Sequence, residues 1–203
     1  MEHLLGTGHL GTNVPAEWQH DSAAAPNGAS SLSGNQTCNW GDEGLGPECK
    51  IQPPTAVGNL LWTLSLLEQA AAYSGNATVL TDVLCPLLDR ALQFYQHIQI
   101  GGNSSMPEVH LPSTFSPEYP GPPGSDANYD VSLYRWGLQQ GIDLAARFPD
   151  APLCGGPHLA AWKDTLARFT WFPVDAATNT LARQVHARHH PCGHNTAGAP
   201  QLN

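Results

Sequence analysis

The sequence predicts an all-α protein made of α-hairpins. Apolar residues recur at helical spacing in residues 55–98 and again in residues 126–169, and clusters of glycine and proline separate these segments. The 203-residue chain is 41% hydrophobic, which is sufficient for one core, but its 20 glycines and 18 prolines require substantial loops between the helices. We therefore expect an almost wholly helical structure between residues 55 and 172.

Composition divides the chain into three regions. Residues 1–39 are rich in Gly, Ala, Ser, Asn and His without a sustained period, which predicts a loop or poorly ordered segment with Trp18 as its only anchor. Residues 40–180 carry the helical pattern. Residues 181–203 depart from that pattern, which predicts a divergent, disordered tail.

The first predicted hairpin contains two apolar stripes. Its first helix starts at Thr55, a candidate N-cap, and ends at Ser74-Gly75-Asn76. Its second helix runs to Gly101-Gly102, and Pro86 is expected to kink or restart it. The stripe residues are Val57, Leu60, Leu61, Leu64, Leu67 and Ala71 in the first helix, and Leu80, Leu84, Leu87, Leu88, Ala91, Leu92, Tyr95 and Ile98 in the second.

The second predicted hairpin follows a long loop. Its first helix starts near Asp126 and ends before Pro149, and its second helix covers about residues 157–169. Because carboxylates at helix starts commonly act as caps, we expect capping roles for Asp126 and Asp130. The stripe residues are Val131, Tyr134, Leu138, Ile142, Ala145 and Phe148 in the first helix, and Leu159, Trp162, Leu166 and Phe169 in the second.

The loop at residues 101–125 is longer than a passive connection in a compact domain, and such loops are commonly functional. We expect it to be exposed at one end of the hairpins. It carries Glu118 between Pro117 and Tyr119, in a segment that its prolines hold extended and stiff. Aromatic neighbours would desolvate this carboxyl group and raise its pKa toward the range of a general acid. The alternative is an ordinary solvated loop residue.

A family resemblance supports the functional interpretation of this loop. The segment Ser113-Thr-Phe-Ser-Pro-Glu118, followed by Asp130 at a helix start, resembles the Ser-Pro-Glu segment of the six-hairpin glycosidases. The similarity is strongest to glycoside hydrolase family 95, the inverting α-L-fucosidase-like enzymes. Flanking segments extend it over about residues 40–175, among them Gly58-Asn-Leu-Leu-Trp62, Leu84-Cys-Pro-Leu-Leu88 and Phe172-Pro-Val-Asp175.

The resemblance implies an (α/α)6 toroid, of which residues 40–180 would form an incomplete part, and a hydrolase that acts on O-glycosyl bonds. It implies that Glu118 is the general acid. The family's catalytic base lies in an Asp-Gly-Asn-like segment without a counterpart here, so this chain alone should be almost inactive. A helical carbohydrate-binding or structural remnant without turnover is the alternative. The expected substrate-binding residues are His110, Tyr119, Asn128, Tyr129, Asp130 and Trp136.

Charge and hydropathy restrict the partners. Only 12% of the residues are charged, and a net charge of −9 argues against nucleic acid and anionic membranes, so a carbohydrate is the expected partner. No apolar stretch reaches the ~18 residues of a membrane span, and the first residues lack a signal-peptide pattern. Sequons at Asn35, Asn76 and Asn103 nevertheless indicate a secretory origin as one possibility, so the localisation stays open.

The five cysteines do not make a paired framework. Cys38 and Cys49 could bridge a loop in an oxidising compartment, Cys85 is expected to pack as a small apolar residue, and free thiols throughout are the alternative. His186-Ala-Arg-His-His-Pro-Cys192-Gly-His194 has ligand types that zinc prefers, but Pro191 and Gly193 interrupt any helix and zinc-finger spacing is not met. We therefore expect no metal and no cofactor.

Overall fold

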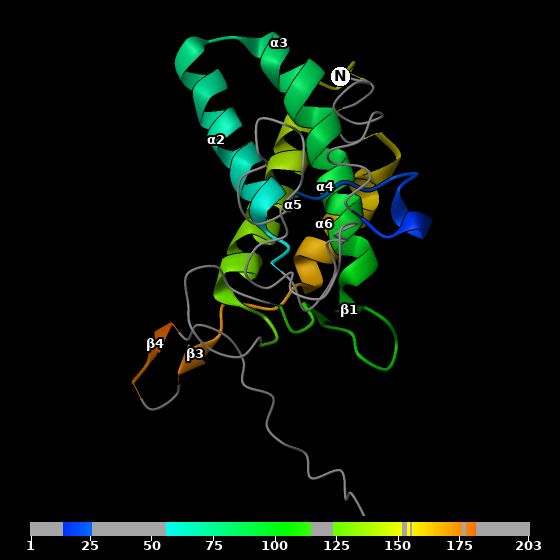
Figure 1. Cartoon of the computed structure of the whole chain (residues 1–203), viewed down its shortest axis with the longest axis vertical. Coiled ribbons are helices and arrows are strands. Elements are labelled where there is room, and N and C mark those ends of the chain that lie inside the picture. Colours follow the sequence, from blue (N-terminus) through cyan, green and yellow to red (C-terminus); the bar gives the residue numbers. More distant parts are fainter. Residues whose placement is uncertain are drawn as a thin grey trace, which may run out of the picture.

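The computed structural model describes residues 14–25, 56–114, 124–151, 154, 156–175 and 178–181. Helices dominate this part of the chain, as Figure 1 shows. They are η2 (Ala16–Trp18), α2 (Asn59–Ser74), α3 (Ala77–Val79), the π-helical η3 (Leu80–Leu84), α4 (Cys85–Ile98), α5 (Asn128–Arg147), η4 (Gly156–His158) and α6 (Leu159–Arg168). The all-α prediction is confirmed for the described residues.

Two small antiparallel sheets accompany the helices. In the first, β1 (Ile100–Gly101) pairs with β2 (Val109–His110), so that Ile100 lies opposite His110. In the second, β3 (Val174–Asp175) pairs with β4 (Thr180–Leu181). The sequence analysis did not predict these pairs, because two-residue strands are too short to show an alternating pattern.

The predicted apolar stripes form the core. Every stripe residue of η3 and α4 is buried, and in the first hairpin only Leu67 is partly exposed. Aromatic rings join the helices: Tyr95 of α4 stacks on Tyr134 of α5 with 4.6 Å between ring centroids, and Tyr134 meets Phe169, which follows α6, edge to face at 5.0 Å. The two hairpins therefore share one core.

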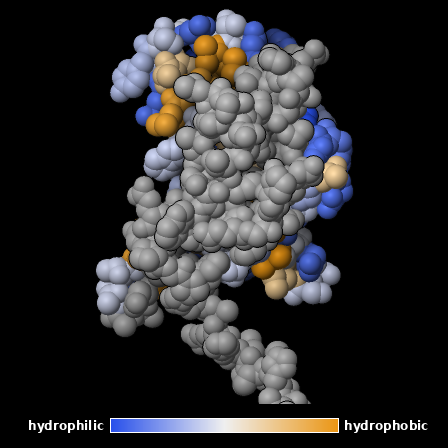
Figure 2. Space-filling view, in the orientation of Figure 1, coloured by the Kyte–Doolittle hydropathy of each residue, from blue (hydrophilic) through white to orange (hydrophobic). Residues whose placement is uncertain are grey.

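The outer face of α2 is not covered by the described residues. Trp62, Leu66 and Tyr73 are 52%, 52% and 93% exposed, and all three lie outside the predicted stripe. Figure 2 shows hydrophilic and apolar side chains next to each other at the end of the molecule where α2 meets α3. The stripe thus identified correctly which face of this helix turns inward.

The helix boundaries follow local chemistry. The helix α2 starts four residues after Thr55, with Gly58 as an N-cap that makes no side-chain hydrogen bond, and Thr55 itself lies outside the described residues. It ends as predicted at Gly75, which adopts a left-handed φ of 66°. Pro86 lies in the first turn of α4, after the π-helical segment. Pro86 lacks the N–H that would donate to the Asp82 carbonyl in a continuous α-helix. A π-helical turn before it and a new α-helix around it are therefore the expected effect of this proline.

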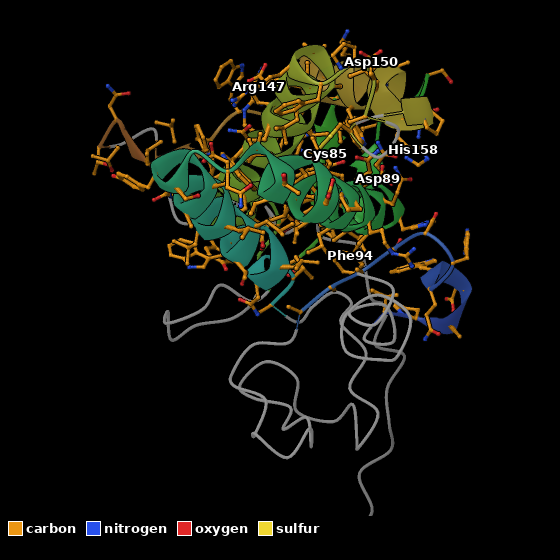
Figure 3. The ribbon with its side chains drawn as sticks, turned by 90° about the horizontal axis from the view of Figure 1, so that it is seen from above. Cys85, Asp89, Phe94, Arg147, Asp150 and His158 are labelled. Carbon is orange, nitrogen blue, oxygen red and sulfur yellow. A yellow bond between two sulfur atoms is a disulfide. The ribbon has the colours of Figure 1, made fainter. Side chains whose placement is uncertain are left out.

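Part of the N-terminal region is packed, which corrects the prediction for residues 14–25. The Ala23 N–H donates to the Arg90 carbonyl of α4 at 3.1 Å, and the Arg90 guanidinium donates to the Gln19 carbonyl at 2.8 Å. Trp18 is an anchor as predicted, since its ring stacks on His97 with 5.2 Å between centroids and meets Phe94 at 6.1 Å (Figure 3). This segment contains too few apolar residues to show a period, so its packing escaped the pattern analysis.

A disulfide joins Cys85 at the start of α4 to Cys154, which follows α5, and their Cα atoms are 4.8 Å apart (Figure 3). The expectation that Cys85 packs only as a small apolar residue is therefore wrong, and so is the alternative of free thiols throughout. Cys85 is buried as expected, but a partner 69 residues away cannot be identified from spacing. Cys38, Cys49 and Cys192 lie outside the described residues.

Removing this disulfide should destabilise the fold. A Cys85→Ser, Cys154→Ser double variant is expected to lose about 2–4 kcal/mol of unfolding free energy, because the cross-link restricts the unfolded chain. Urea unfolding followed by circular dichroism measures the loss. A reducing agent should lower the stability of the unmodified chain by more than it lowers that of the double variant. The single variants Cys85→Ser and Cys154→Ser are the controls: each should lose as much as the double variant, and two smaller losses that add up to it would contradict the cross-link.

Candidate functional site

The loop that carries Glu118 starts and ends at a pair of backbone hydrogen bonds. Thr114 and Gly124 form an antiparallel bridge in which the Thr114 N–H donates to the Gly124 carbonyl at 3.2 Å and the Gly124 N–H donates back at 3.3 Å. The residues between them, 115–123, lie outside the described residues, and these include the predicted Glu118 and Tyr119. The structure thus fixes the two ends of the loop that carries the predicted acid.

The carboxylate of Asp126 holds the chain that leads into this loop. It is buried, and it accepts hydrogen bonds from the Leu111 N–H at 2.8 Å and from His110 Nδ1 at 2.9 Å. The Asp126 N–H donates in turn to the Leu111 carbonyl at 3.3 Å. Asp126 has a φ of 49°, a left-handed conformation that aspartate tolerates better than most residues. The expectation that Asp126 caps the helix is wrong, because Ala127 is the N-cap of α5 and no side chain caps it.

The hydrogen bond to Asp126 shows that the Nδ1 atom of the His110 ring carries a proton. A carboxylate oxygen accepts, so Nδ1 must carry the proton. The other ring nitrogen, Nε2, lies 3.5 Å from a carboxylate oxygen of Glu108, and the His110 side chain is 28% exposed. His110 therefore keeps one nitrogen toward the protein and the other at a partly open surface.

Asp130 holds the start of the loop. It is fully buried in the first turn of α5, and the Thr114 hydroxyl donates to one of its oxygens at 2.6 Å while the Tyr95 hydroxyl donates to the other at 3.2 Å. Burial raises the pKa of the Asp130 carboxyl to about 7, and the hydrogen bonds from Thr114 and Tyr95 oppose this rise. Burial also raises the pKa of the Tyr95 phenol, which therefore remains a donor. The expected capping role of Asp130 is wrong.

The loop at residues 101–125 is only partly exposed, in contrast to the prediction. Val109, Leu111 and Thr114 are completely buried. The turn between β1 and β2 is exposed, and Figure 1 shows it projecting from the end of the molecule where α4 ends. The difference has a physical reason: residues 109–114 contribute apolar side chains to the core and hydrogen-bonding groups to the two buried carboxylates.

An aromatic pair lies beside this loop. Tyr129 precedes Asp130 on α5 and is half-buried, and its hydroxyl donates to Asn59 Oδ1 at 3.3 Å. Its ring lies 6.0 Å from the exposed ring of Trp62, centroid to centroid, at an interplanar angle of 30°. The amide nitrogen of Asn59 is buried and has no hydrogen-bond partner among the described residues. This arrangement places an aromatic pair, one ring of which is exposed, beside a buried amide nitrogen without a described partner.

The other predicted site residues lie on α5. Asn128 is the first residue of this helix, and both its carbonyl and its side chain accept from the Ser132 hydroxyl, at 2.7 and 3.2 Å. Trp136 is partly buried against the core, seven residues after Tyr129 and therefore on the same helix face. Of these residues, the structure joins Asp130 to the loop through Thr114, and the backbone of Gly58, directly before α2, lies against the side chains of Tyr129 and Asp130.

Sequence reasoning missed three residues that this geometry makes important. Trp62 stacks near Tyr129, Asn59 holds the Tyr129 hydroxyl, and Thr114 connects the loop to Asp130. A signal existed for Trp62, because a tryptophan outside the apolar stripe of its helix is expected to be exposed. Asn59 and Thr114 had no comparable signal, since their partners lie 70 and 16 residues away in the chain.

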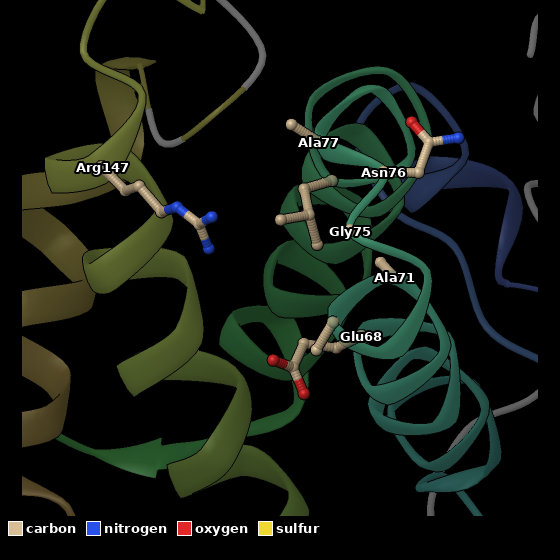
Figure 4. Close-up of a pocket in the computed structure, with 8 residues that line it drawn as sticks. Glu68, Ala71, Gly75, Asn76, Ala77 and Arg147 are labelled. Carbon is tan, nitrogen blue, oxygen red and sulfur yellow. The ribbon is translucent and has the colours of Figure 1, made fainter.

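A separate hollow lies at the other end of α2. Figure 4 shows Glu68 and Arg147 facing each other across it, and its lining also includes Gly75 and Leu80. Its volume of about 90 Å³ is far below the ~300 Å³ of the smallest usual ligand pockets. It is too small for a sugar and adds nothing to the site.

Neither a metal site nor a membrane span is found in the described ranges. Among these residues, no three His, Cys, Asp or Glu side chains are grouped closely enough to hold a metal ion. No helix in this part of the chain is long and apolar enough to cross a membrane. The histidine cluster at residues 186–194 lies outside the described residues.

Comparisons with protein-family models, curated proteins and solved structures find no match to this chain.

Proposed function

We propose that the chain is part of an inverting glycoside hydrolase of the α-L-fucosidase-like type, in which Glu118 is the general acid. The observation that carries the proposal is the attachment of the Glu118 loop to two buried carboxylates, Asp126 and Asp130. A surface loop without a function needs no such attachment, because burying two carboxyl groups costs free energy that only their hydrogen bonds offset.

The attachment serves the requirement of acid catalysis. A general acid must lie within about 2.6–3.2 Å of the oxygen that it protonates, and functional side chains need support that holds them within about 0.5 Å. Thr114 lies four residues before Glu118, and Gly124 lies six residues after it. Hydrogen bonds at both positions fix the two ends of the segment that carries Glu118, and the prolines in its sequence favour an extended backbone.

The two buried carboxylates, Asp126 and Asp130, are not available as the catalytic base. Inverting enzymes place the base about 6.5–9.5 Å from the acid, with a free oxygen for the attacking water. Both oxygens of Asp126 accept from His110 and Leu111, and both oxygens of Asp130 accept from Thr114 and Tyr95. We infer that another part of a complete toroid supplies the base, and that the two hairpins described above are two of its six.

In this proposal the aromatic residues bind the sugar. Trp62 and Tyr129 present ring surface next to the unpartnered Asn59 amide. The other aromatic residues that were predicted to bind substrate are Tyr119 in the loop and Trp136 on α5. A fucosyl ring has one apolar face, with which it would stack on the exposed ring surface of this pair.

An activity assay tests the proposal. The 203-residue chain should hydrolyse aryl α-L-fucosides and α-galactosides barely detectably, because one general acid contributes only about 10²–10⁴-fold and glycosidases need far more. A longer product of the same gene that includes the remaining hairpins should be active on one of these substrates. Inactivity of such a product on both would contradict the proposal, as would full activity of the 203 residues alone.

The second candidate is a helical carbohydrate-binding or structural protein without turnover. The pairing of Trp62 with Tyr129 favours sugar binding independently of any carboxylate. Trp62→Ala should weaken binding of methyl α-L-fucoside by about 2–10-fold, measured by calorimetry, because an aromatic contact of this type is worth about 0.5–1.5 kcal/mol. Tyr73→Ala, at the exposed far end of the same helix, is the matched control and should leave the affinity unchanged. Equal affinity of all three proteins would show that the aromatic pair is not a sugar site.

A further inference from the structure

The disulfide between Cys85 and Cys154 indicates an oxidising compartment. It joins two elements that the described core already holds together, and disulfides of this kind persist in secreted proteins and are rare in reducing cytosol. In such a compartment the three sequons of the chain meet the enzymes that attach glycans to asparagine. Two of the sequons, at Asn76 and Asn103, lie in the described part of the chain.

The first sequon, Asn76-Ala77-Thr78, lies at the turn between α2 and α3. Asn76 is exposed and is the N-cap of α3, and its Oδ1 accepts from the Thr78 N–H at 3.1 Å. Its amide nitrogen makes no hydrogen bond to any described residue. Figure 4 shows this nitrogen directed away from Arg147 and from the hollow that Arg147 faces.

The second sequon, Asn103-Ser104-Ser105, lies in the exposed turn between β1 and β2. Asn103 Oδ1 accepts from the Ser105 N–H and from the Met106 N–H, both at 2.9 Å. Asn103, Ser104 and Ser105 are all exposed. Both sequons thus have the same geometry, in which the amide oxygen is engaged by the backbone of the hydroxyl residue and the amide nitrogen is left toward solvent.

We propose that Asn76 and Asn103 are acceptor sites for N-linked glycans and that the chain matures in the secretory compartment where its disulfide forms. The oxygen of each side chain stabilises the local turn, and the nitrogen is the atom that glycosylation uses. Attachment therefore keeps both turns intact, because an N-glycosylated amide still has its acceptor oxygen. The two sites lie at opposite ends of the helices in Figure 1, so two glycans would not collide.

The reaction requires a lipid-linked oligosaccharyl diphosphate as donor. The asparagine Nδ2 attacks C1 of the first sugar and forms the C–N bond, while the C1–O bond to the diphosphate breaks. The lipid diphosphate leaves with the bonding electrons, and one amide proton passes to a base of the transferring enzyme. No electron is gained or lost.

Peptide mass spectrometry tests the proposal on the chain isolated from its natural source and on the full chain secreted by cultured eukaryotic cells. Release of N-glycans by an amidase in heavy-oxygen water should convert Asn76 and Asn103 to labelled aspartate in both samples. The peptides of Cys85 and Cys154 should appear joined before reduction. Unlabelled asparagine at either position in the natural chain would overturn the assignment of that site, and unlabelled asparagine at both would overturn the proposal.

Variants of the hydroxyl residues separate the sequon from the turn. Thr78→Ala and Ser105→Ala keep the asparagine, its hydrogen bond to the backbone and the fold, but they should abolish labelling at Asn76 and Asn103 respectively. Thr78→Ser and Ser105→Thr preserve the sequons and should retain labelling. Labelling that persists in an alanine variant would contradict the proposal, because the modification would then not depend on the sequon.

Discussion

Glutamine in place of Glu118 should lower the hydrolysis of unactivated α-L-fucosides by about 10²–10⁴-fold in the longer gene product, which is the contribution of one positioned general acid. The amide has nearly the shape of the carboxylic acid, so binding and folding should be preserved, but it cannot deliver a proton to the glycosidic oxygen. The quantity to measure is kcat/KM, for a disaccharide and for an aryl fucoside with a good leaving group.

The comparison of the two substrates decides the role of Glu118. An activated leaving group needs little protonation, so the aryl fucoside should lose much less rate than the disaccharide. Glu17→Gln is the matched control, since Glu17 is an exposed carboxylate in η2 and has no assigned part in binding or proton transfer. Equal losses on both substrates in the Glu118 variant would indicate that the residue binds a sugar hydroxyl.

Much of the fold could be predicted because the core follows single-helix patterns. The stripe of η3 and α4 is buried at every predicted position, since the spacing of apolar residues depends only on helical geometry. The same reasoning located the turn at Gly75 and the restart at Pro86, where one residue decides the backbone conformation. At these positions, helical periodicity and the preferences of glycine and proline predicted the local structure correctly.

The rest depends on contacts between distant residues, which one sequence does not display. Asp126 and Asp130 occupy positions typical of helix caps, yet the loop that folds back over α5 presents Leu111 and Thr114 to them as donors. The partner of Cys85 lies 69 residues away, and residues 14–25 bind α4 through hydrogen bonds with Arg90 and through the ring of Trp18. In each case tertiary packing replaced the local role that the sequence indicated.

The two carboxylates hold the loop in different ways. Asp126 accepts from a backbone N–H and an imidazole at the partly open side of the loop. Asp130 accepts only from hydroxyls and has no exposed surface, so its ionised form is desolvated without a cationic partner. The attachment at Thr114 should therefore be the one that responds to pH.

Stability should fall by about 3 kcal/mol between pH 4 and pH 7 because of Asp130 alone, since a folded pKa of about 7 stands against about 3.9 in an unfolded chain. The sign follows from proton binding. In this interval the folded state retains the Asp130 proton and the unfolded state has lost it, so raising the pH favours unfolding until the folded carboxyl also ionises near pH 7. Above that pH the contribution is constant.

Asp130→Asn should remove this slope, because an amide stays neutral at every pH and still offers an oxygen to the Thr114 or Tyr95 hydroxyl. Urea unfolding free energies measured at intervals from pH 4 to pH 8 should show the variant gaining on the unmodified chain as the pH rises. Asp143→Asn, an exposed position on the same helix, is the control for a general change of charge and should run parallel to the unmodified chain. If the unfolding free energy of the Asp130 variant also changes with pH in parallel with that of the unmodified chain, the Asp130 carboxyl has the same pKa in the folded and the unfolded state. Burial then does not raise its pKa. A gain confined to Asp130→Asn would identify the buried Asp130 carboxyl, to which Thr114 and Tyr95 donate, as the pH-sensitive point at which the Glu118 loop is attached to the core.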